Sequence, residues 1–178
     1  MENIPTIPVE EDLIPRGVVP WLVPLTPRKP GQGEITSAEI QAAYEAAFQI
    51  AGDDWLHKLL RLFLTIRTPF YFADQYYKPV EDELLLMILD ADTGDKEEYE
   101  AEYYDCDDFA FRLMGWFHMD RDAAAWPIFI TWVNTPAGGH AVLSYYQDGQ
   151  VFIIEPQTDQ VFPVPSDWSL MLLCGPGL

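Results

Sequence analysis

Residues 139–155 read GHAVLSYYQDGQVFIIE, and this stretch decides the fold. Two runs rich in β-branched and aromatic residues flank Asp148-Gly149, and an Asp-Gly pair between such runs is a strong signal for a β-hairpin. Similar runs at 126–134 and 169–174 predict two further strands. The C-terminal half of the chain therefore predicts an antiparallel sheet.

The two-residue turn also predicts the register of the hairpin. Counting outward from the turn pairs Val142 with Glu155 and His140 with Gln157, and all four side chains share one face. Glu155 is then the diagonal neighbour of His140, roughly 7–8 Å away between backbones, a gap that long side chains can bridge. We therefore expect His140 to contact Glu155, with Gln157 as the alternative partner.

Helical patterns dominate the chain before the sheet. A capping box at Thr36-Ser37-Ala38-Glu39 starts a first helix that stops at Gly52. A second helix is expected from Asp53 or Asp54 to before Pro69, a third from Pro79 to about Leu89, and a fourth that begins at Cys106 and carries 107–117. Helices followed by a sheet predict an α+β fold.

Residues 1–35 hold seven of the fifteen prolines. Because proline fixes φ and lacks an N–H, this stretch can neither extend a helix nor form a central strand. We expect an extended arm packed on the domain, and residues 36–178 as a single α+β domain.

Composition limits the classes of partner. The 178 residues carry a formal charge of −19 and are 49% apolar, which favours a folded acidic protein and argues against nucleic acid and anionic membrane. The two cysteines cannot form a disulfide framework, and no signal peptide or membrane span is visible. We expect a soluble cytoplasmic protein with neutral or basic partners and an unknown oligomeric state.

The acidic charge is concentrated at 81–108, which contains thirteen carboxylates and one lysine. A solvated acidic surface explains most of this run. Asp105, Asp107 and Asp108 lie beside Cys106 and could instead supply hard oxygen ligands to Ca²⁺. No cofactor is required by the sequence, and calcium is the one metal that we keep open.

Three residues form a candidate triad. Cys106 begins a helix, where exposed N–H groups and the helix dipole favour a thiolate. His140 follows two glycines at a strand start, and Glu155 could orient its imidazole. A small buried cysteine and a structural strand histidine are the alternatives.

The runs YYDCDDFAFRLMGW and GGHAVLSYYQDGQVFIIEPQTDQVFPV resemble the transglutaminase-like cysteine peptidases of bacteria, within the papain-like superfamily. The use of Glu as third member is similar to the papain-like C-terminal domain of the fungal agglutinin from Marasmius, which is calcium-dependent. The resemblance covers 104–163 and implies a papain-like or transglutaminase-like fold, with a nucleophile helix packed on an antiparallel sheet.

The resemblance implies Cys106 as nucleophile, His140 as general base and acid, and Glu155 as orienting residue. Gln75 and Tyr103 are candidate donors to an oxyanion. The implied function is a cysteine hydrolase, either a peptidase or an amidase, or a transglutaminase-like acyl transferase, with a peptide or protein substrate. The alternative is an inactive version of the fold that serves as an acidic protein-binding or assembly module.

Overall fold

The computed structural model describes residues 34–48 and 70–175. Nearly all of the expected N-terminal arm and the whole of the expected second helix lie outside these residues. The division into an arm and a single domain therefore stays a prediction.

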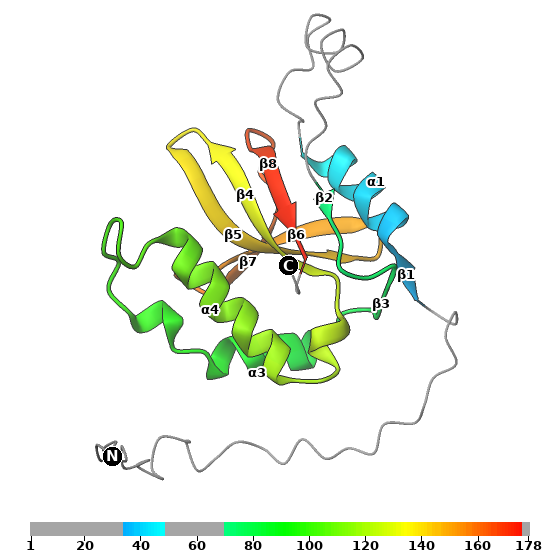
Figure 1. The fold of residues 1–178 in the computed structure, drawn as a ribbon, viewed down its shortest axis with the longest axis horizontal. Helices are drawn as coiled ribbons and strands as arrows, with labels where there is room; N and C mark the ends of the chain where they lie inside the picture. The colour runs from blue at the N-terminus through cyan, green and yellow to red at the C-terminus, as the bar shows by residue number, and fades with distance from the viewer. Residues whose placement is uncertain (1–33, 49–69, 176–178) are drawn as a thin grey trace, which may run out of the picture.

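A six-stranded sheet forms the centre of the structure (Figure 1), in the order β2-β8-β4-β5-β6-β7. In that order the strands are Phe70–Tyr71, Ser169–Cys174, Ile128–Thr135, Gly138–Gln147, Gln150–Glu155 and Gln160–Pro163. All neighbouring pairs are antiparallel except β2 and β8, which are parallel. The expected antiparallel sheet is therefore a mixed one. A separate antiparallel pair joins β1 (Ile35–Thr36) to β3 (Tyr76–Tyr77).

Helices cover both faces of this sheet. The longer helices are α1 (Ser37–Ala47), α3 (Asp82–Ala91) and α4 (Cys106–Met119). One 3₁₀ turn, η1 (Gly94–Lys96), lies between α3 and α4, and another, η2 (Ala123–Ala125), follows α4. Figure 1 shows α3 and α4 together below the sheet, with α1 apart from them beside β2. The structure is α+β, as the sequence predicts.

Two buried clusters hold the layers together. One joins α3 and α4 to one face of the sheet, through residues such as Leu113 and Leu143. The other joins α1 to the opposite face, through residues such as Tyr44 and Val142. Because adjacent strand residues point to opposite faces, Val142 and Leu143 serve different clusters, and β5 is apolar on both faces. This two-sided burial explains the nearly continuous apolar run of the strand.

Local signals in the sequence account for most element boundaries. Thr36 and Glu39 form the expected capping box at the start of α1, and β8 has the expected bounds. The third helix begins later than expected, at Asp82 rather than Pro79. Glu81 has extended backbone angles as the N-cap of the helix, and the N–H of Lys78 before it bonds to the carbonyl of Ala125.

Candidate functional site

His140 and Glu155 form the polar centre of the candidate site. His140 Nε2 lies 2.7 Å from Glu155 Oε2, and the two side chains are 23% and 18% exposed. The expected hairpin register is observed from Gln147↔Gln150 to Leu143↔Ile154, after which the ladder ends. The same register continued by one pair makes Glu155 the diagonal neighbour of His140, and their long side chains bridge the gap.

The carboxylate of Glu155 is held from a second side. Its Oε1 accepts a hydrogen bond from the backbone N–H of Gln157 at 3.3 Å. Gln157 therefore supports Glu155 through its backbone N–H, in the turn between β6 and β7. The side-chain partner of the His140 imidazole is Glu155. This arrangement fixes one ring nitrogen of His140 and leaves Nδ1 for another partner.

Trp168 adds an aromatic wall that we did not single out from the sequence. Its ring meets the His140 ring edge-on, with centroids 6.3 Å apart, and it packs edge-on against Phe162 as well. A tryptophan just before the last strand gave no local sign of this contact, because it depends on how β8 joins the sheet. The backbone beside His140 is open, since a Cβ placed on Gly139 would meet no atom within 4 Å.

Cys106 is the first residue of α4 and is a half-buried free thiol. The residue packs against the buried cluster that contains Ala141, which follows His140 on β5. Within the described part of the chain, no hydrogen bond joins its sulfur to His140. The structure therefore places Cys106 against the buried cluster that includes Ala141 of β5, and no thiol–imidazole bond is formed among the described residues.

The aspartates around Cys106 cap the helix. Asp105 Oδ1 accepts from the N–H of Asp107 at 3.4 Å, and Asp108 Oδ2 accepts from the N–H of Asp105 at 3.1 Å. A side-chain hydrogen bond between Asp105 and Asp107 lowers the pKa of Asp105 and raises that of Asp107. These carboxylates thus have a structural reason to be there, which weakens the case for a metal site.

A metal ion could still be held at this helix start. One ligand atom from each of Asp105, Cys106 and Asp107 lies within 4.8 Å of the other two. Asp108 is not part of that group, because its carboxylate turns back to the N–H of Asp105. Calcium binding at the three aspartates remains a prediction.

The two oxyanion candidates lie in exposed segments. Tyr103 is 80% exposed, in the turn before α4. Gln75 lies between β2 and β3, where its backbone carbonyl accepts from the N–H of Ser37 at 3.1 Å. No contact in the described residues brings either side chain to the His140–Glu155 pair, so both assignments stay predictions.

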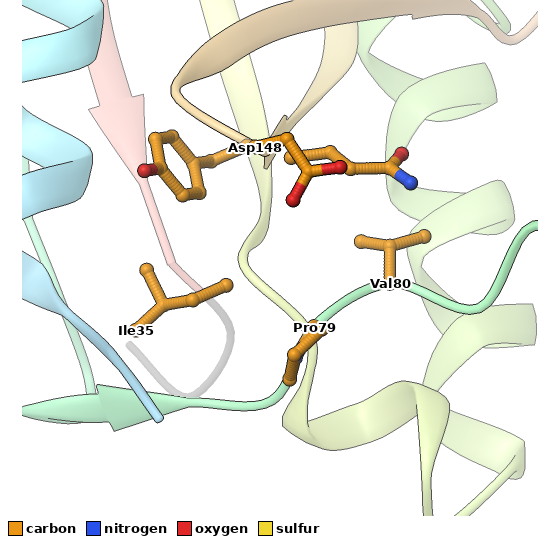
Figure 2. A pocket seen from close by; sticks show the side chains of 6 residues that line it. Ile35, Pro79, Val80 and Asp148 are labelled. Carbon is orange, nitrogen blue, oxygen red and sulfur yellow. The ribbon is translucent and has the colours of Figure 1, made fainter. Parts of the chain in front are cut away.

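A pocket of about 270 Å³ lies at the other end of β5 (Figure 2). Figure 2 shows Ile35, Pro79 and Val80 on one side and Asp148, in the hairpin turn, on the other; Tyr146 and Gln147 complete the lining. His140 is seven residues from Gln147, or about 23 Å at the usual rise of a strand. The pocket is therefore separate from the His140–Glu155 pair.

Comparison with solved structures identifies a shared fold. The structure of PSL1a in complex with E64 has a TM-score of 0.63 and 18% sequence identity, covering 80% of this chain and 51% of that one. The structure of Polyporus squamosus lectin bound to the human-type influenza-binding epitope Neu5Acα2-6Galβ1-4GlcNAc has a TM-score of 0.60 and 18% identity, covering 80% and 49%. This chain thus spans about half the length of those chains. No family model and no curated protein matches it.

These comparisons correct the functional expectations. The named structures belong to a lectin, so the assignment to papain-like or transglutaminase-like cysteine peptidases is wrong, as are the cysteine hydrolase function and the peptide or protein substrate. The acidic protein-binding or assembly module is not matched either. The Asp-Cys-Asp-Asp motif misled because Asp105 and Asp108 are accounted for by helix capping. Within the described residues, no helix is long and apolar enough to cross a membrane.

Proposed function

We propose that this chain is a small-ligand-binding domain whose site comprises Cys106, His140 and Glu155. The observation that carries the proposal is the 2.7 Å bond between the partly buried side chains of His140 on β5 and Glu155 on β6. A partly buried acid–imidazole pair costs desolvation, and a functional site is one reason to keep it. Trp168 beside it supplies the apolar wall typical of small-molecule sites.

Each residue has a distinct role in this proposal. Glu155 orients the imidazole, so that Nδ1 of His140 can accept a proton or a ligand hydrogen bond. Cys106 provides a thiol at a helix N-terminus, where backbone N–H groups favour negative charge. Such a site suits a polar ligand that reacts with or hydrogen-bonds to a thiol.

E64, the ligand named with PSL1a, is a suitable probe because it is an epoxide. In the adduct, a bond forms between Cys106 Sγ and an epoxide carbon, and the carbon–oxygen bond of the ring breaks. The thiol proton passes to the new alkoxide, with His140 as the carrier. Atoms and charge balance without any further reactant.

The test is the rate of thiol alkylation by iodoacetamide, measured by peptide mapping. Cys174 is an internal control, since burial raises the pKa of its thiol. We expect Cys106 to react at least ten-fold faster than Cys174, and His140→Ala and Glu155→Gln to reduce that ratio. Equal rates at the two cysteines, or rates at Cys106 that ignore both substitutions in a folded protein, would contradict the proposal.

A saccharide site in the pocket at Tyr146 and Asp148 is a second candidate. An aromatic ring, the amide of Gln147 and a carboxylate line it, which are groups that bind sugar hydroxyls. The charge of −19 and the carboxylate in the pocket favour a neutral sugar over a sialylated one. Titration with Galβ1-4GlcNAc, followed by NMR, should shift the Tyr146 signals in the native chain and not in Asp148→Ala; no shift at all would exclude this candidate.

A further inference from the structure

The pocket at the hairpin turn carries negative charge that no described cation neutralises. Asp148 lines the pocket, and Asp82 accepts a hydrogen bond at 3.0 Å from the amide of Gln147, another lining residue. The ion pairs formed within the described residues involve neither of these carboxylates. Figure 2 shows the Asp148 carboxylate facing the space between the hairpin turn and the segment that carries Pro79 and Val80. The pocket therefore offers an acidic group to a ligand.

The rest of the lining suits the stem of a long basic side chain. Ile35, Pro79 and Val80 form an apolar wall, and Tyr146 adds an aromatic ring. Lys and Arg side chains bury their methylene stems along apolar surface, and their charged heads are attracted to carboxylates and to aromatic faces. With these groups around it, a pocket of about 270 Å³ fits one basic side chain.

Charge is divided unevenly between the described residues and the rest of the chain. The described residues contain 23 of the 29 carboxylates but only four of the ten Lys and Arg residues. The stretch 13–33, which precedes β1, has the opposite balance, with three cations and no carboxylate. Opposite charges on two parts of one chain attract each other, and the covalent tether raises the local concentration of one part at the other. The basic stretch is therefore well matched to the acidic pocket.

The chain enters β1 at the pocket itself. Ile35 is both the first residue of β1 and a lining residue. Lys29 is six residues earlier, at most about 20 Å away along an extended chain. Between them stand Pro30-Gly31, a pair that favours a turn, and a second glycine at position 33. A chain reversal at these residues brings Lys29 back to the pocket that Ile35 lines.

We propose that the basic pair Arg28-Lys29 docks at this pocket, with the Lys29 ammonium at Asp148 and its stem against Tyr146. The expected N-terminal arm is then packed on the domain at a defined place. A docked arm occupies the pocket, so that the arm and a saccharide compete for it. This competition rests on the second candidate function above, whereas docking of the arm does not.

Limited trypsin digestion of the full chain measures the docking, with the peptides followed by mass spectrometry. Trypsin cuts after Arg28 and after Arg16, and Arg16 is the internal reference because it lies farther from the pocket along the chain. We expect Asp148→Asn and Tyr146→Ala to raise the ratio of cleavage at Arg28 to cleavage at Arg16 at least five-fold. Asn-Gly favours the same tight turn as Asp-Gly, so Asp148→Asn keeps the hairpin and the test stays decisive if Tyr146→Ala does not fold.

A matched control and a crosslink locate the docked segment. Asp167→Asn removes the same charge from the exposed turn before β8 and should leave the cleavage ratio unchanged. A carbodiimide joins amines to adjacent carboxylates, and peptide mapping should find Lys29 linked mainly to Asp148.

Three results would overturn the proposal. The cleavage ratio could be the same in Asp148→Asn as in the native chain, or Asp167→Asn could raise it equally. Lys29 could also be linked mainly to the carboxylates at 92–108. Neither measurement uses a sugar or the thiol, so a failure here leaves the tests of the proposed function unaffected.

Discussion

A chain of three buried hydroxyls ties α1 to the sheet and gives the sharpest prediction about stability. Tyr44 of α1, Ser144 of β5 and Thr131 of β4 are all 0% exposed. The Ser144 hydroxyl lies 2.7 Å from the Tyr44 hydroxyl and 2.5 Å from that of Thr131. Burial raises the pKa of Tyr44, so its hydroxyl stays neutral. Ser144 is therefore the shared partner of the other two.

Ser144→Ala leaves the Tyr44 hydroxyl buried without a partner, whereas Thr131 keeps the carbonyl of Phe129 at 3.3 Å. We expect the variant to lose about 2 kcal/mol of unfolding free energy, within the range for stranding a buried polar group. Tyr44→Phe removes the hydroxyl itself and leaves Ser144 bonded to Thr131. Its expected cost is about 1 kcal/mol.

The double variant separates this network from simple loss of contacts. In the Ser144→Ala background no partner remains for the Tyr44 hydroxyl, so Tyr44→Phe should be neutral or stabilising. Urea unfolding of the four proteins measures this coupling, which we expect at about 1 kcal/mol or more. Additive losses would refute the reasoning. Because α1 and α4 cover opposite faces, alkylation of Cys106 should be the same in all four.

Three further predictions concern single features of the fold. Thr36→Ala removes the hydroxyl that accepts from the N–H of Glu39 at 3.2 Å, and urea unfolding should show a loss of about 1 kcal/mol, with no change if the cap is unimportant. Trp126→Ala empties a fully buried position and should cost about 3–5 kcal/mol by the same method, and a loss below 1 kcal/mol would contradict the packing. Burial raises the pKa of Asp159 to about 6, so between about pH 4 and about pH 6 the folded state binds more protons than the unfolded state, and stability should fall as pH rises through this range; Asp159→Asn should flatten this slope, and an unchanged slope in the variant would contradict the raised pKa.

Local sequence signals predicted the parts of the fold that depend on neighbouring residues. The Asp148-Gly149 turn fixed the pairing of β5 with β6, because the side-chain period of a strand is two and a tight turn leaves one register. The capping box at Thr36 marked a helix start for the same local reason. These signals also sufficed to bring His140 next to Glu155.

Features that depend on distant contacts could not be predicted in this way. The parallel pairing of β2 with β8 joins residues about a hundred positions apart, and β7 is a short edge strand that ends in Pro163. The family assignment failed for another reason, since short motifs around Cys106 also serve helix capping.

The most direct test of the proposed ligand site is the mass of the intact chain after incubation with E64, followed by peptide mapping. The account predicts a single adduct on Cys106, slowed at least ten-fold in His140→Ala and reduced in Glu155→Gln, with Cys174 unmodified. An unmodified Cys106 in the folded native chain, or an adduct that forms equally fast in both variants, would contradict it.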